Sequence, residues 1–137
     1  MRSILIIIIT AFLFGCSSSD NKSPRVVIET RQGDIVIELY PEQAPRSVEA
    51  FLTYVKRGYY RNSSFYRVLN DENQPSDALK AALIQGGTYR SQPRLNDTLP
   101  GIPHESTNIT NILHKDGTIS LARTEPGTAT TEFFICI

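Results

Sequence analysis

Apolar and polar residues alternate along two short stretches, residues 25–30 and residues 34–40. In the second stretch, Ile35, Ile37 and Leu39 fall on one face of an extended chain. Alternation with a period of two is typical of a strand with one buried face, and the glycine between the two stretches favours a turn. The pattern therefore predicts a β-hairpin.

A helical period follows the hairpin. Pro45 is well suited to the first turn of a helix, because the N–H that proline lacks would have no partner there. Four apolar residues then recur at spacings of three and four, which places them on one helix face: Val48, Phe51, Leu52 and Val55. Gly58 suits the C-terminal cap. We therefore expect one amphipathic helix between Pro45 and Gly58.

The remaining apolar stretches are short. Four of them predict strands: residues 65–69, 83–87, 117–123 and 132–137. Residues 70–81 begin as a polar segment, in which Ser76 is expected to cap a short helical turn that continues to Ala81. Residues 88–111 contain several prolines and are expected to be mostly loop. Many short strands with one or two helices favour a mainly β fold, either a barrel or a sandwich with helical covers.

Composition and charge narrow the function classes. The chain has 137 residues, enough for one domain, and its 14 basic and 14 acidic residues give a net charge of zero. A general nucleic-acid binder carries an excess of basic residues, so we expect no nucleic-acid partner. Two cysteines cannot form a disulfide-rich scaffold. His104 and His114 have no further ligands at metal-binding spacing, which argues against a zinc site.

The first residues are typical of an export signal. Arg2 precedes an apolar run over residues 4–14, which is shorter than the roughly 20 residues of a membrane-spanning helix. Residues 13–16, which end in Gly15-Cys16, resemble the lipobox of bacterial lipoproteins. An uncleaved anchor, or an ordinary signal peptide with an incidental cysteine, is the alternative.

The lipobox resemblance implies that residues 1–15 are a cleaved signal peptide and that the Cys16 thiol carries a diacylglycerol. Residues 16–24 would then be the lipidated cysteine and a flexible tether. The serine after Cys16 implies an anchor in the outer membrane, facing the periplasm. Since Cys16 is then unavailable for a disulfide, Cys136 is expected to be a buried free thiol.

Seven short motifs stand in the order and near the spacing of one known family: residues 33–39, 44–51, 58–60, 64–68, 84–87, 117–123 and 132–135. Together they resemble the cyclophilin-type peptidyl-prolyl cis-trans isomerases from about residue 25 to residue 137. The resemblance implies a cyclophilin-like antiparallel β-barrel with covering helices. It also implies catalysis of X-Pro bond rotation in folding envelope proteins, without a cofactor or a metal.

The reaction itself explains why an arginine is needed. Resonance in the peptide bond creates a rotation barrier of roughly 18–20 kcal/mol. In the twisted transition state the prolyl nitrogen regains its lone pair, which a permanently charged N–H donor can bind. Such a hydrogen bond strengthens only as the amide twists, so it raises the rate rather than mere affinity.

The resemblance assigns these roles residue by residue. Arg67 is the catalytic arginine, and Gln85 orients it together with the substrate carbonyl. The remaining candidates bind substrate. Phe134 and Leu83 surround the proline ring, and the backbone of Ala122 and Arg123 binds the residue before proline. The fifth candidate is the carboxylate of Glu132. Outside the family context, each has an ordinary reading as a core or surface residue.

Several positions depart from the family pattern. Glu132 stands where glutamine is usual, and its carboxylate is expected to pair with Arg67 or Arg123. Tyr66 replaces the usual histidine, and Ala82 replaces a phenylalanine of the pocket wall. Residues 70–81 are an insertion, for which we consider three roles: a surface loop, which we favour, a lid, or a replacement wall supplied by Leu79.

The family also continues beyond the strand at which this sequence stops. Its last strands and closing helix have no counterpart before Ile137, so we expect residues 25–137 to be an incomplete isomerase domain. A fragment of a longer protein is favoured over a genuine truncation. The expected partners are proline-containing folding polypeptides and, through the lipid anchor, a membrane; we expect a monomer. Two alternatives are a non-catalytic peptide-binding or scaffolding lipoprotein with the same fold, and a structural envelope lipoprotein.

Overall fold

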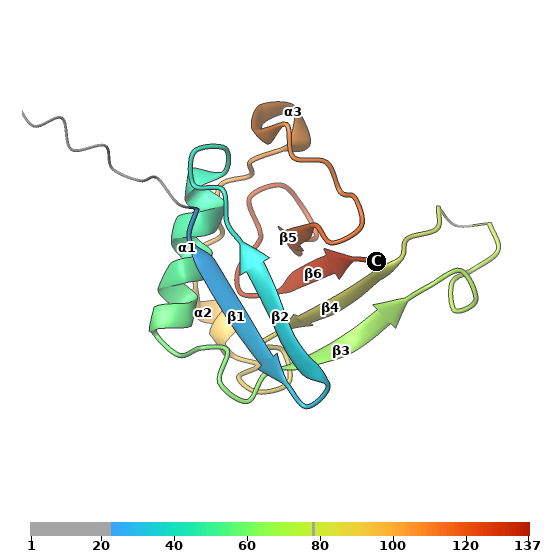
Figure 1. The fold of residues 1–137 in the computed structure, drawn as a ribbon, viewed down its shortest axis with the longest axis horizontal. Helices are drawn as coiled ribbons and strands as arrows, with labels where there is room; N and C mark the ends of the chain where they lie inside the picture. The colour runs from blue at the N-terminus through green and yellow to red at the C-terminus, as the bar shows by residue number, and fades with distance from the viewer. Residues whose placement is uncertain (1–22, 78) are drawn as a thin grey trace, which may run out of the picture.

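A computed structural model describes residues 23–77 and 79–137 of the chain. In this part, strands and short helices follow one another as β1 (Arg25–Thr30), β2 (Gly33–Glu38), α1 (Pro45–Lys56), β3 (Ser64–Leu69), β4 (Leu83–Gly87), α2 (Leu95–Thr98), α3 (Thr107–Thr110), β5 (Ile119–Leu121) and β6 (Phe133–Cys136). The strands form two antiparallel sheets, β1-β2 and β3-β4-β6-β5 (Figure 1). The predicted mainly β fold with few helices is confirmed. The signal and lipidation predictions at residues 1–15 and Cys16 lie outside the described residues.

The predicted hairpin is formed by β1 and β2. Its register runs from Arg25 opposite Glu38 to Thr30 opposite Gly33. Gly33 has a φ of +126°, a conformation that residues with a Cβ rarely adopt, and this closes the turn. Ile37 is buried on the inner face, so the alternation in the sequence correctly identified the buried side.

The predicted helix is α1, with proline in its first turn as expected. Its buried residues are Val48, Phe51 and Tyr54, whereas Leu52 is only half-buried. Gly58 has a φ of +71° and ends the helix with the left-handed residue that glycine favours. The helix packs beside the β1-β2 hairpin (Figure 1).

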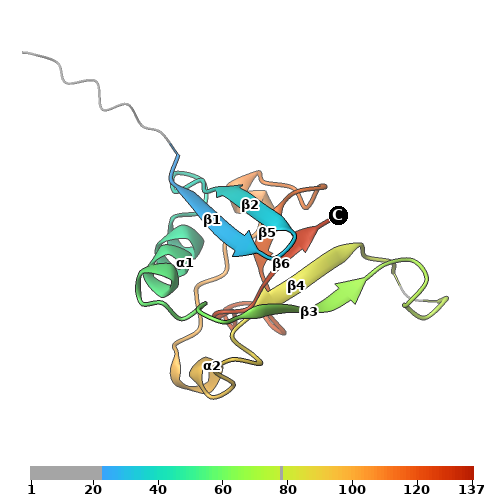
Figure 2. The same cartoon turned by 60° about the horizontal axis from the view of Figure 1, so that its bottom comes forward.

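The four-stranded sheet contains all four strands predicted after the helix. The central β4 pairs with β3 on one side and with β6 on the other, and β5 is the short outer strand next to β6. A second view shows the β1-β2 hairpin and α1 lying across this sheet (Figure 2). Among the described residues, no helix is long and apolar enough to cross a lipid bilayer.

The insertion between β3 and β4 projects from the body as an arm (Figures 1 and 2). The predicted helical turn is wrong: residues 79–82 have no helical structure, although residue 78 itself lies outside the described residues. Instead, Gln74 bridges the loop, since its Nε2 donates to the carbonyls of Asn70 (2.6 Å) and Ala81 (2.8 Å). Its Oε1 accepts from the Ala81 amide at 3.0 Å. The side chain thus satisfies backbone groups of the loop without a helical turn.

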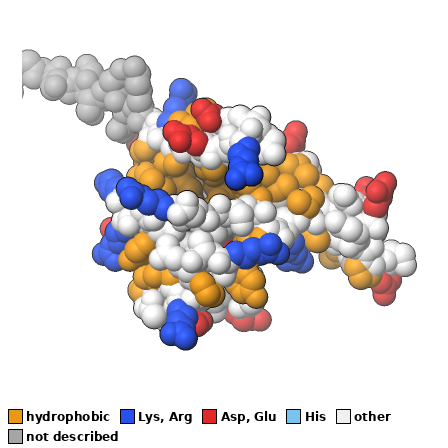
Figure 3. All heavy atoms as spheres, turned by 90° about the horizontal axis from the view of Figure 1, so that it is seen from below, with side chains coloured by type: hydrophobic (Ala, Val, Ile, Leu, Met, Phe, Trp, Pro, Cys, Tyr) orange, Lys and Arg blue, Asp and Glu red, His pale blue; other side chains and the backbone are white. Residues whose placement is uncertain are grey.

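The surface of the arm is that of a solvated loop. Its Leu79 is 98% exposed, so it does not rebuild a hydrophobic wall as one of our alternatives required. Seen from below, the arm reaches to the right and carries acidic side chains (Figure 3).

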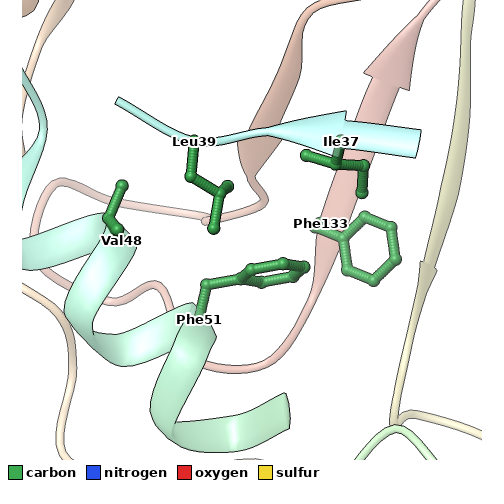
Figure 4. Close-up of a cluster of buried hydrophobic side chains, with 5 residues drawn as sticks. All are labelled: Ile37, Leu39, Val48, Phe51 and Phe133. Atoms are coloured by element: carbon green, nitrogen blue, oxygen red, sulfur yellow. The ribbon is translucent and has the colours of Figure 1, made fainter. Parts of the chain in front are cut away.

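The main core lies between the hairpin, α1 and β6. Five buried side chains form it and point toward one another (Figure 4): Ile37, Leu39, Val48, Phe51 and Phe133. The Phe133 ring meets the rings of Phe51, Tyr60 and Phe65 edge to face or nearly so, with centroids 5.7 to 5.9 Å apart. Aromatic pairs in this geometry are stabilised beyond simple burial of area. The core therefore fixes the inner face of β6, and with it the direction of the outer face.

Candidate active site

One row of residues crosses the four-stranded sheet. Arg67 on β3 is opposite Gln85 on β4, Gln85 is opposite Phe134 on β6, and Phe134 is opposite Ser120 on β5. Residues directly opposite one another on paired strands point to the same face. The sheet therefore brings Arg67, Gln85 and Phe134 together on the face opposite the buried Phe133.

A bulge in β3 adds a further side chain to this row. The register shifts between Phe65 and Arg67, so Tyr66 is an extra residue on β3. A bulge re-aims side chains at the irregularity. As a result the Tyr66 hydroxyl reaches Gln85 and Glu132, at 2.9 Å from Gln85 Nε2 and 2.6 Å from Glu132 Oε2.

Arg67 and Gln85 are hydrogen-bonded. The Arg67 Nη1 donates to Gln85 Oε1 at 3.2 Å, and the arginine side chain is exposed. A guanidinium carries five N–H donors in a rigid plane, so one contact with Gln85 orients the group and leaves donors for a ligand. This arrangement places the two predicted catalytic residues within direct reach of each other.

Glu132 does not make the predicted ion pair with Arg67 or Arg123. Its Oε2 accepts from the Tyr66 hydroxyl, and its Oε1 accepts from the backbone amides of Thr88 (2.8 Å) and Tyr89 (3.0 Å). Backbone amides are fixed donors that bind a carboxylate without the entropy cost of ordering a long side chain. The carboxylate is therefore held by Tyr66 and by the backbone just after β4, and it does not pair with either arginine.

Gly87 makes this position of Glu132 possible. The residue has a φ of +144°, and a Cβ built on it would lie 2.5 Å from Glu132 Oε2 and 2.7 Å from Oε1. A side chain at position 87 would thus occupy the space of the carboxylate. Gly87 is therefore required here by sterics as well as by backbone conformation.

The two predicted pocket residues lie on the same face of the sheet as Gln85. Leu83 is two residues before Gln85 on β4 and is half-buried. The Phe134 ring stacks on the His114 imidazole, with centroids 5.6 Å apart and planes at 19°. Both residues line a cleft of about 1420 Å³ between β2 and the β5-β6 side of the sheet, which also reaches core residues such as Phe133 and is not lined by Arg67 or Gln85.

Arg123 also lines this cleft. It is exposed, and its Nη2 is 3.4 Å from His104 Nε2. The preceding Ala122 is bonded to the residue just before β6, because its amide donates to the Glu132 carbonyl at 2.8 Å. Ala82, just before β4, also lines the cleft, but it is exposed and has only a methyl group where the family pattern has a phenylalanine ring.

The sequence did not indicate every residue of this site. Tyr66 was recognised only as a departure from a family pattern, although it connects Gln85 to Glu132. His114 lies in a loop, and only its stacking on Phe134 in the tertiary structure identifies it. Asn96 lies in α2, a segment predicted as loop, and its Nδ2 donates to Glu132 Oε1 at 3.1 Å. No local pattern marks contacts of this kind.

Within residues 23–77 and 79–137, no group of three His, Cys, Asp or Glu side chains is arranged to hold a metal ion. Cys136 is a free cysteine that is half-buried rather than fully buried. Burial raises the pKa of its thiol above the usual value.

Comparisons with known proteins identify the family of the chain. The family profile "Cyclophilin type peptidyl-prolyl cis-trans isomerase/CLD" matches residues 25–137. Peptidyl-prolyl cis-trans isomerase B of Escherichia coli (strain K12) is 35% identical over 111 residues, which cover 80% of this chain and 60% of that protein. A putative peptidyl-prolyl cis-trans isomerase of Staphylococcus aureus (strain USA300) is 33% identical, with 81% and 51% covered. The chain thus spans between half and two thirds of the length of these relatives.

A solved structure shows the same fold. The cyclophilin-type peptidyl-prolyl cis-trans isomerase of Cryptosporidium parvum, crystallised in the presence of the dipeptide Ala-Pro, superimposes with a TM-score of 0.59 at 25% identity. The match covers 82% of this chain and 67% of that chain. Since the family profile covers the whole segment from β1 to β6, the chain belongs to the cyclophilin-type peptidyl-prolyl cis-trans isomerase family.

Proposed function

We propose that this chain catalyses cis-trans isomerisation of X-Pro bonds in folding polypeptides. The observation that carries the proposal is the row on the outer face of the sheet, in which exposed Arg67 is hydrogen-bonded to Gln85 and Gln85 lies opposite Phe134. This row combines a directed cation with an aromatic surface. Those are the two elements that the twisted X-Pro transition state requires.

In the proposed mechanism no covalent bond forms or breaks. Phe134 and Leu83 hold the proline ring by apolar contact while the preceding residue turns. As the amide twists, its nitrogen becomes a hydrogen-bond acceptor and Arg67 donates to it. Gln85 keeps the guanidinium in place, so that little reorganisation is needed when the nitrogen lone pair appears.

The proposed substrates are polypeptides that contain proline. The Cryptosporidium relative was crystallised in the presence of Ala-Pro, and the cleft beside Phe134 and Arg123 offers both an apolar surface and a cation. Unfolded chains populate both X-Pro isomers and exchange them over tens to hundreds of seconds. An isomerase would accelerate this slow step of folding.

The test is an isomerisation assay on a short proline-containing peptide with the full chain. We expect Arg67→Ala to lower kcat/KM by about 10²- to 10³-fold, as for removal of one transition-state hydrogen-bond donor. The control is Arg31→Ala, which removes an exposed arginine from the turn between β1 and β2 and should retain activity. Peptide binding without turnover in the unsubstituted chain would overturn the enzymatic proposal.

We further propose that the domain acts at the cell envelope as a lipoprotein, anchored through Cys16. The apolar run over residues 4–14 followed by Gly15-Cys16 supports this, as does the polar stretch that precedes β1 at Arg25. We expect metabolic labelling with a fatty-acid analogue to mark the chain and Cys16→Ser to abolish the label. A chain that is labelled equally after this substitution would contradict the anchor.

A further inference from the structure

Four polar side chains form one continuous hydrogen-bonded chain at the site. Arg67 Nη1 lies 3.2 Å from Gln85 Oε1, Gln85 Nε2 lies 2.9 Å from the Tyr66 hydroxyl, and that hydroxyl lies 2.6 Å from Glu132 Oε2. We propose that Glu132 is a positioning residue, which acts through Tyr66 to orient the Gln85 amide so that its oxygen faces Arg67. This inference rests on the proposed isomerase activity for its effect on rate.

The chemistry of the two ends sets the direction of every hydrogen bond between them. A guanidinium only donates, and a carboxylate only accepts. Because Glu132 accepts, the single Tyr66 proton is directed to Glu132, and the Tyr66 oxygen is left to accept. Gln85 must then turn its NH₂ group to Tyr66 and its oxygen to Arg67.

The carboxylate end is itself firmly held. Thr88 and Tyr89 donate their backbone amides to Glu132 Oε1, and Asn96 Nδ2 donates at 3.1 Å. Asn96 is oriented in turn by the hydroxyls of Thr130 and Thr131, which donate to its Oδ1. Hydrogen bonds to an ionised acceptor are stronger than those between neutral groups. The Glu132 carboxylate is therefore held in one position, and it fixes the direction of the Tyr66 O–H.

Tyr66 is suited to transmit this orientation. Burial and the hydrogen bond to Glu132 raise the pKa of its hydroxyl well above the usual value. The hydroxyl therefore keeps its proton at neutral pH and always has that proton to donate to Glu132. The position of Tyr66 at the bulge brings the hydroxyl to Gln85 as well.

A glutamine at position 132 would no longer fix the direction of the hydrogen bonds through Tyr66 and Gln85. Its NH₂ group can donate to the Tyr66 oxygen, and the Tyr66 proton is then free to point at Gln85. In that arrangement Gln85 turns its oxygen to Tyr66 and its NH₂ group to the Arg67 guanidinium, so that two donors face each other. Arg67 would lose the partner that places it for the prolyl nitrogen.

The test compares Glu132→Gln, Tyr66→Phe and the double variant by kcat and KM on a proline-containing peptide. We expect each single substitution to lower kcat by about tenfold with KM little changed, and the double variant to lose no more than either single one. The matched control is Glu105→Gln, since Glu105 also accepts two backbone amides, from Arg46 and Ser47, but has no hydrogen bond to Tyr66 or Gln85. It should keep the original kcat.

A second measurement does not depend on activity. Heteronuclear NMR of the Gln85 side-chain amide in the full chain reports the hydrogen bond of its NH₂ group. We expect Glu132→Gln and Tyr66→Phe to shift these signals and Glu105→Gln to leave them unchanged. Thermal unfolding of each variant shows that the fold is retained.

The outcomes are distinct. Unchanged Gln85 signals in a folded Glu132→Gln variant would overturn the positioning role, and so would losses in kcat that multiply in the double variant. If the unsubstituted chain shows no turnover while the Gln85 signals shift as expected, the proposed isomerase function fails and the orienting role of Glu132 stands.

Discussion

Tyr60 is a buried tyrosine whose hydroxyl has one defined partner. It donates to the Thr131 carbonyl at 3.0 Å, and its ring packs against Phe51 and Phe133. Burial, followed by the neighbouring charges of Tyr54 and Glu132, raises the pKa of Tyr60 far above its usual value. The folded protein therefore strongly prefers the neutral phenol.

This preference predicts a loss of stability in alkali. In the unfolded chain the tyrosine ionises at about pH 10, whereas in the folded protein it stays neutral. Its contribution to the free energy of unfolding is therefore complete below about pH 10 and is lost as the pH rises further. Urea unfolding between about pH 8 and about pH 11 should show a falling free energy of unfolding, with a shallower fall in Tyr60→Phe. At neutral pH the variant should lose about 1 kcal/mol for the missing hydrogen bond. Parallel pH curves for the two proteins would contradict this account.

At the scale of elements, the N-terminus of α1 is capped from outside the helix. Ala44, at the capping position, offers no side-chain hydrogen bond. Instead Glu105 accepts the amides of Arg46 and Ser47, at 3.0 and 2.8 Å, although it is 59 and 58 residues away in sequence. A carboxylate at a helix N-terminus satisfies free amides and complements the helix dipole.

We therefore expect Glu105→Ala to lower the free energy of unfolding by about 1 kcal/mol, as for loss of a helix cap. The control is Glu49→Ala, which changes an exposed glutamate within the same helix and should alter stability by less than about 0.5 kcal/mol. Chemical denaturation measures both. Equal losses in the two variants would mean that the contact with Glu105 does not stabilise the helix.

At the scale of the whole molecule, β6 separates the core from the site. Phe133 is 5% exposed and packs in the main core, whereas Phe134 lies half-buried on the opposite face next to His114. Two identical side chains in adjacent positions thus face the core and the proposed substrate site separately. Period-two alternation in a strand is the physical reason.

The pair allows a direct comparison of stability and function. We expect Phe133→Ala to cost about 3–5 kcal/mol in unfolding free energy, because it leaves a cavity among aromatic rings. Phe134→Ala should cost about 1 kcal/mol and mainly raise KM for a proline-containing peptide. Denaturation and steady-state kinetics on both variants test this. Similar stability losses would show that Phe134 also belongs to the core.

Much of the fold was predictable from the sequence, because its signals are local. The alternation around Ile35 and Ile37 and the helical spacing from Val48 to Val55 each arise within a few residues and depend on backbone geometry alone. The family motifs added the register, so that Arg67, Gln85 and Phe134 were expected to act together. The failed expectation of a helical turn after Ser76 is also instructive, since Gln74 bonds the loop backbone where a helix would have done so.

By itself, then, the sequence determined the order of the strands and of α1, the buried face of β2 and the residue types that the chemistry needs, whereas the short helices α2 and α3 form in a segment predicted as loop. Only the tertiary structure decided the partners of Glu132, the capping of α1 by Glu105 and the stacking of His114 on Phe134. Tyr66 and Glu132 are 66 residues apart, and their contact depends on a bulge in one strand and on a glycine in another. Such contacts exist only once the register of several strands is set, because a shift of one residue would turn each side chain to the opposite face.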